Sequence, residues 1–64
     1  MKLNGKEIDV KPNTTILNLL KELEIKIDSV VVEVNLDIIE NHQYSSYILN
    51  SDDIVEVIRF VGGG

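Results

Sequence analysis

The chain has 64 residues, 44% of them hydrophobic, and it carries a formal net charge of −5 with no cysteine. So short a chain forms one small domain with too little material to enclose a deep pocket, which argues against a self-sufficient enzyme. The lack of cysteine excludes disulfides, thiolate metal sites and a cysteine nucleophile. No apolar stretch is long enough for a secretory signal or a membrane span, so we expect a cytoplasmic domain without a membrane partner.

The charges are unevenly distributed along the chain. Residues 1–26 include five basic and four acidic residues, whereas residues 27–64 include one basic and seven acidic residues. Nucleic-acid binding requires clustered basic residues that replace phosphate counterions, and this chain lacks such a cluster. The acidic half favours a basic protein partner, although charge of this sign also serves solubility alone.

The first residues are typical of a β-hairpin. Lys2-Leu3 and residues 6–10 flank Asn4-Gly5, and Asn-Gly favours a type I′ turn because both central residues need a positive φ. Residues 11–14 contain a proline, which cannot donate to a ladder and therefore ends the second strand. The side chains expected to face the core are Leu3, Ile8 and Val10.

A helix is predicted next. Thr14 or Thr15 is suited to cap its N-terminus, and apolar residues then recur at helical spacing. We expect the helix to end near Glu24, because residues 25–27 alternate with a period of two. The apolar stripe comprises Ile16, Leu19, Leu20 and Leu23.

The remaining chain is richer in strands. Residues 30–34 predict a strand that is buried at alternate positions, residues 35–37 a turn, and Ile38-Ile39 a short strand. Residues 40–53 are the least regular, and they end in a turn over residues 50–53. Residues 54–61 predict the last strand, so the order indicates a single α+β domain over residues 1–61, with one helix on one mixed sheet. The alternate buried positions are Val30, Val32 and Val34, and the expected anchors of the irregular stretch are Tyr44, Tyr47, Ile48 and Leu49.

Side chains suited to catalysis or metal binding are scarce. His42 is the only histidine, with no partner at ligand spacing, so we expect an exposed loop residue. Asp52 and Asp53 lack the glycine and the spaced oxygen ligands of an EF-hand loop, and we interpret them as turn residues. The sequence therefore predicts no metal site, no catalytic residue and no permanently bound cofactor.

The chain ends in Gly62-Gly63-Gly64, directly after a predicted strand. Glycine has no side chain and wide backbone freedom, so we expect residues 62–64 to be a flexible tail that reaches roughly 10 Å beyond the last strand. Such a tail can thread a narrow channel in a partner. Its reactive group is the carboxylate of Gly64, which becomes an acyl donor once attack on the α-phosphate of ATP makes it an acyl-adenylate. The alternative is a frayed, inert end.

The last predicted strand carries large apolar residues on both faces, whereas one helix covers only one face of a sheet. Ile58 and Phe60 are therefore expected to remain partly exposed beside the tail and, with Val61, to form a docking surface for a partner. The alternative is that residues 40–50 fold over them, with Tyr44 and Tyr47 as the cover.

Four stretches of the chain resemble the family of sulfur carrier proteins of thiamin biosynthesis (ThiS), a β-grasp, ubiquitin-like family. Three are the hairpin around Asn4-Gly5, the helix entry at residues 15–20 and the strand at residues 30–35. The most specific is Asp53-Ile54-Val55-Glu56-Val57-Ile58-Arg59-Phe60-Val61-Gly62-Gly63-Gly64, because the family usually reads Asp, any residue, Val-Glu-Ile, a short apolar stretch and Val-Gly-Gly-Gly. The resemblance implies a β-grasp fold, with one helix packed on a mixed four- to five-stranded sheet.

The resemblance also implies a function. An E1-like adenylyltransferase would use ATP to adenylate the carboxylate of Gly64, which would then become a thiocarboxylate with sulfur from a donor such as a cysteine desulfurase. Gly62 and Gly63 would thread Gly64 into the partner active sites, and thiazole synthase would receive the sulfur. The chain would then be a protein substrate and carrier rather than an enzyme.

Two departures and three alternatives accompany this resemblance. Asp52 stands where the family usually has glycine, and aspartate preserves the turn because it tolerates a left-handed conformation. Ile39-Glu40-Asn41 replaces the usual Val-Pro-Arg, which implies different partner contacts in the loop of residues 36–50. The alternatives are a carrier like the small subunit of molybdopterin synthase, a ubiquitin-like modifier attached to lysines, and a binding module with an inert tail.

Overall fold

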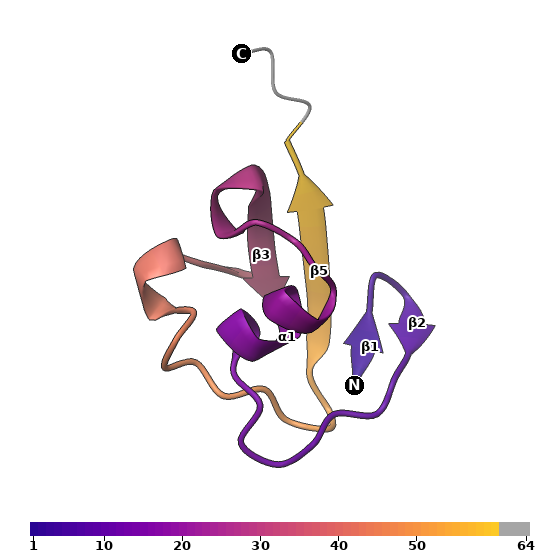
Figure 1. Cartoon of the computed structure of the whole chain (residues 1–64). Coiled ribbons are helices and arrows are strands. Elements are labelled where there is room, and N and C mark those ends of the chain that lie inside the picture. Colours follow the sequence, from indigo (N-terminus) through magenta and orange to yellow (C-terminus); the bar gives the residue numbers. More distant parts are fainter. Residues whose placement is uncertain (61–64) are drawn as a thin grey trace.

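A computed structural model of the chain describes residues 1–60 and shows a single mixed sheet in that range (Figure 1). The sheet has five strands in the order β2-β1-β5-β3-β4. β1 and β5 are parallel, and every other pair of neighbours is antiparallel, as the mixed sheet requires. The strands are β1 (Lys2–Leu3), β2 (Lys6–Glu7), β3 (Val30–Val34), β4 (Asp37–Ile39) and β5 (Ile54–Arg59).

The opening hairpin has the predicted turn but a shorter second strand. Asn4 and Gly5 have φ values of 50° and 81°, as a type I′ turn demands. β2 ends at Glu7, three residues short of the expected bound. The Ile8 N–H still donates to the Met1 carbonyl at 2.9 Å, and the three predicted inner residues are half-buried against the core.

The helix α1 (Ile16–Glu22) lies across one face of this sheet (Figure 1). Thr15 is its N-cap: Oγ1 of Thr15 accepts from the Asn18 N–H at 3.1 Å, and Oδ1 of Asn18 accepts from the Thr15 N–H at 3.1 Å. This capping box satisfies two amides that the helix itself leaves unpaired.

The C-terminus of α1 comes two residues earlier than expected. Glu24 has a φ of 58°, and the N–H groups of Glu24 and Ile25 donate back to the carbonyls of Lys21 and Leu20 at 3.1 and 2.9 Å. This is a Schellman motif, which closes the helix without a glycine. The period of two at residues 25–27 therefore does not mark a strand, and the short 3₁₀ helix η1 (Ile27–Ser29) follows.

The core lies between α1 and the inner face of the sheet. Leu23 does not join it, and its prediction as the last residue of the apolar stripe is wrong: it is the C-cap of α1 and 43% exposed. Ile48 was also expected as an anchor but is 48% exposed, because the neighbouring Leu49 points inward in an extended segment. The buried apolar residues are Met1, Ile16, Leu19, Leu20, Val30, Val32, Val34, Ile39, Tyr44, Leu49 and Val55.

Hydrogen bonds of the Asp53 side chain hold the start of β5 in place. Its side-chain oxygens accept from Asn35 Nδ2 at 3.0 Å and from the Asn50 N–H at 2.8 Å, while Asn35 Oδ1 accepts from the Ile54 N–H at 2.9 Å. The turn over residues 50–53 is confirmed, and Asp52 does not adopt a positive φ there, so its backbone tolerance is not needed. Asp53 is thus a buried structural residue that sets the register of β5 against the β3–β4 turn.

The β3–β4 turn contains a strained leucine. Asn35 and Leu36 have φ values of 52° and 74°, and the Leu36 side chain is 86% exposed. A left-handed conformation costs an L-residue about 1–2 kcal/mol. Glycine avoids this cost, but it loses more backbone entropy on folding, which costs about 0.5–1 kcal/mol. We expect Leu36→Gly to raise the melting temperature by about 3–6 °C. Leu36→Ala, which keeps the Cβ atom, is the control in the same thermal melt and is expected to give no rise.

Within residues 1–60, no helix is both long and apolar enough to cross a membrane.

Candidate functional site

β5 carries the predicted docking residues along the centre of the sheet. It lies between β1 and β3, and Ile58 is the register partner of Val31. The ladder continues one residue past the strand, because the Phe60 N–H donates to the Ser29 carbonyl at 3.0 Å. This hydrogen bond holds the backbone of Phe60 against the end of η1.

Ile58 and Phe60, two of the three predicted docking residues, are exposed, as the sequence predicts. Ile58 is 48% exposed and Phe60 57% exposed. The alternative cover by residues 40–50 is wrong, because Tyr44 is 3% exposed and belongs to the core, whereas Tyr47 is half-buried against that same core. α1 covers only the inner face, and nothing within residues 1–60 covers Ile58 and Phe60 enough to bury them.

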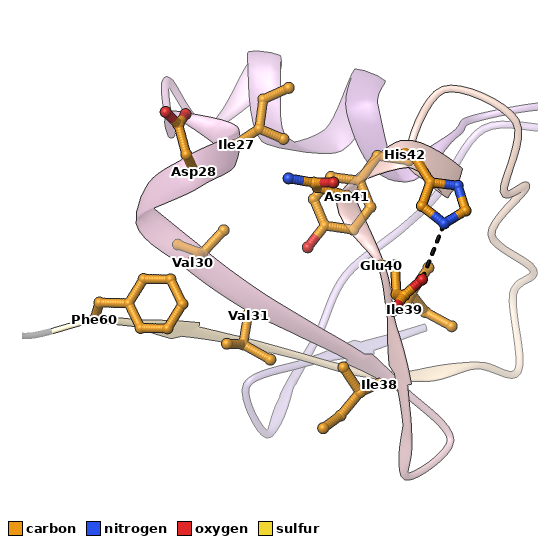
Figure 2. A pocket seen from close by; sticks show the side chains of 11 residues that line it. Ile27, Asp28, Val30, Val31, Ile38, Ile39, Glu40, Asn41, His42 and Phe60 are labelled. Carbon is orange, nitrogen blue, oxygen red and sulfur yellow. Dashed lines mark hydrogen bonds and ion pairs between the residues drawn. The ribbon is translucent and has the colours of Figure 1, made fainter.

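Phe60 also borders an open groove of about 430 Å³ (Figure 2). The groove lies between η1, the first residues of β3, the strand β4 and the 3₁₀ helix η2 (Asn41–Gln43). Burial raises the pKa of the Tyr44 hydroxyl above its ordinary value, an effect that the nearby backbone of Val32 partly offsets. The other apolar lining residues are Ile27, Val30, Val31, Ile38 and Ile39.

The polar end of the groove carries no catalytic constellation. His42 is exposed, as expected, and its Nε2 lies 2.9 Å from Oε2 of Glu40 on the surface of η2 (Figure 2). Among the described residues no three His, Cys, Asp or Glu side chains are grouped to hold a metal ion.

Four predicted site residues, Val61, Gly62, Gly63 and Gly64, lie outside the described residues. The structure places β5 and Phe60 directly before them. Their proposed roles rest on the sequence and on the relatives described below.

Sequence reasoning missed part of the exposed surface. Ile38 and Ile54 are 66% and 56% exposed and lie on the same face as Ile58, opposite α1. The signal was available in the alternation of each strand, since Ile39 and Val55 beside them are buried. A domain with one helix leaves every outward position of its sheet uncovered.

One helix across a mixed sheet of order β2-β1-β5-β3-β4, entered through a β-hairpin, is the β-grasp arrangement of ubiquitin-like domains. A thiamine biosynthesis protein (ThiS) from Geobacter metallireducens shares this structure with a TM-score of 0.80 and 29% sequence identity, and the match covers 98% of this chain and 96% of that one. The β-grasp fold that the sequence implied is confirmed.

The family follows from the sequence comparisons. The model of the ThiS family matches residues 1–64, so this chain belongs to the ThiS family. The Sulfur carrier protein ThiS of Bacillus subtilis is 38% identical over 65 residues, which cover 100% of this chain and 98% of that protein. A Thiazole synthase of Paramagnetospirillum magneticum is 36% identical over 62 residues, and the match spans 97% of this chain but only 19% of that longer protein.

Proposed function

We propose that this ThiS-family sulfur carrier holds its sulfur on the carboxylate of Gly64, for thiazole formation in thiamin biosynthesis. The observation that carries the proposal is the family match over residues 1–64, which includes the three terminal glycines. The B. subtilis relative, named a sulfur carrier, is similar over its whole length. In this role the chain is a substrate of partner enzymes and needs no cofactor of its own.

The chemistry requires activation of the carboxylate, because its leaving group would otherwise be oxide. Attack of a Gly64 oxygen on the α-phosphate of ATP forms an acyl-adenylate and releases pyrophosphate. A sulfur nucleophile then attacks the acyl carbon and displaces AMP. When this nucleophile is the outer sulfur of a persulfide on the donor, an acyl disulfide forms, and a thiol reductant cleaves its S–S bond to leave the thiocarboxylate. We assign the first step to an E1-like adenylyltransferase and the sulfur to a donor such as a cysteine desulfurase, both in the cytoplasm.

We propose thiazole synthase as the sulfur acceptor. Two relatives named Thiazole synthase, from P. magneticum and Magnetococcus marinus, each match this chain at 36% identity over 62 residues, which is 19% of their length. A domain of this kind therefore occurs within the same polypeptide as a thiazole synthase. That association supports transfer from Gly64 to such an enzyme.

Phe60 and Ile58 are proposed to dock the carrier on its partners while Gly62 and Gly63 pass into their active sites. Phe60→Ala removes an exposed ring and leaves the backbone hydrogen bond to Ser29 in place. We expect partner affinity to fall about 10- to 30-fold with an unchanged melting temperature. Calorimetric titration of the adenylyltransferase measures the affinity. Ile48→Ala, an apolar truncation at another exposed site, is the control, and equal affinity of the Phe60 variant and the wild type would refute this docking role.

Intact mass spectrometry tests the proposed function. The chain is incubated with ATP, an adenylyltransferase of proven activity and a sulfur source, beside a sample without ATP. An ATP-dependent gain equal to the exchange of one oxygen for sulfur, mapped to Gly64, is the expected result. No gain in mass would favour the alternative of a binding module with an inert tail. Higher-mass conjugates through target lysines would identify a ubiquitin-like modifier.

A further inference from the structure

The part of the sheet face opposite α1 that β3, β4 and β5 form, here called the outer face, is apolar apart from a central acidic pair. Its three isoleucines are 48–66% exposed, and they alternate along β4 and β5 with residues buried under α1. Exposed apolar side chains that gather on one face mark an interaction surface more often than isolated ones do. The outer face comprises Val31 and Glu33 of β3, Ile38 of β4, and Ile54, Glu56 and Ile58 of β5.

Two glutamates occupy the middle of the outer face. Glu33 is the register partner of Glu56 on β5, and on its other side it is the partner of Ile38 on β4. Like charges directly opposite in a ladder have Cβ atoms about 4.5–5.5 Å apart and destabilise the sheet. Neither carboxylate forms an ion pair within residues 1–60, although Lys2 lies on the same face opposite Ile54. The free protein therefore keeps two mutually repelling charges inside an apolar surface.

The acidic pair decides which occupant fits this face. In a symmetric dimer the same surface of two copies would meet, which would bring Glu33 and Glu56 of both copies into one interface. Four carboxylates that lose water without a countercharge oppose such a dimer. A partner that presents an arginine or lysine amid apolar side chains relieves the repulsion and covers the isoleucines, since arginine pairs readily with carboxylates at interfaces.

We infer that the outer face docks on an apolar surface of thiazole synthase, with a basic side chain of that enzyme seated between Glu33 and Glu56. The inference rests on the proposed function for the identity of the partner. The face is continuous with Ile58 and borders Phe60, so a partner seated on it lies beside the residue that leads to the tail. The occurrence of a similar domain within thiazole synthase polypeptides favours this enzyme as the occupant.

The test measures affinity of the sulfur-free full chain for thiazole synthase by calorimetric titration at about 50 and 300 mM salt. We expect the double variant Glu33→Gln with Glu56→Gln to bind at least about tenfold more weakly at low salt and to lose most of the salt dependence. Its melting temperature is expected to rise by about 1–5 °C, because the repulsion is gone. Glu22→Gln with Glu24→Gln changes the net charge equally on the side of α1, and this control is expected to bind like the wild type.

The outcomes separate this inference from the proposed function. Equal affinity and equal salt dependence of the Glu33/Glu56 variant and the wild type for thiazole synthase would overturn the inference. It would also be overturned if the variant lost affinity for the adenylyltransferase alone. Association of the wild-type chain into dimers through this face, seen by light scattering and abolished by Ile38→Asp, would overturn it as well. Because the titration uses sulfur-free chain, it gives its answer whether or not Gly64 accepts sulfur in the mass experiment.

Discussion

Removal of Gly63 and Gly64 is expected to abolish the ATP-dependent gain of sulfur, with a yield below detection in intact mass spectrometry. The shortened chain still ends in a glycine carboxylate, that of Gly62, so the chemical group survives while its reach is lost. Two residues of extended chain span about 7 Å, and a nucleophile displaced by that distance cannot attack the α-phosphate of a bound ATP. Reach, rather than the presence of a carboxylate, is therefore what the variant removes.

A second variant separates reach from bulk in the tail. Gly63→Val keeps the length of the chain but adds a branched side chain where a narrow channel is proposed, and we expect at least about a 100-fold slower gain of sulfur. Both variants should bind the adenylyltransferase through Ile58 and Phe60 with less than about a tenfold change in affinity, since the docking surface is intact. Full sulfur loading of the truncated chain would contradict the proposed role of the tail.

Leu20→Ala is expected to have the largest effect on stability. Leu20 is 1% exposed and packs from α1 into the only cluster of buried residues within residues 1–60. Truncation of a buried leucine costs about 2–5 kcal/mol, whereas a core of this size supplies about 3–5 kcal/mol in total. We therefore expect the variant to be substantially unfolded at room temperature, with a urea midpoint close to zero.

Leu23→Ala is the matched control, because it makes the same chemical change beside the end of α1 at a residue that is 43% exposed. Its expected cost is about 1 kcal/mol, since less apolar surface is lost from the interior. Circular dichroism during urea titration measures both variants. Equal midpoints for the two variants would show that α1 does not cover the core as the structure has it.

The local elements were largely predictable because short-range chemistry determines them. Asn4-Gly5 specified its turn through the positive φ of both residues, and Thr15 with Asn18 specified the helix start through the capping box. The end of α1 escaped prediction because its Schellman motif uses Glu24 in place of the usual glycine. The irregular stretch was predicted by its anchors Tyr44 and Leu49, while Ile48 was misplaced because an extended segment alternates its side chains.

Some features of the candidate site were likewise predictable from the sequence, and others only the structure shows. The exposure of Ile58 and Phe60 followed from a strand with two apolar faces and a chain with one helix. The family followed from resemblances spread along the chain, which the match over residues 1–64 confirms. Nothing in the linear order, however, indicates that Glu33 lies opposite Glu56 or that Ile38 continues the same row. That register arises because the buried side chains of β3 and β5 pack under α1 and the Asp53 hydrogen bonds fix where β5 begins. The sequence by itself therefore determined most of the elements and the family, whereas the tertiary structure decided which charges share the outer face, since pairing between distant strands depends on packing that no local pattern encodes.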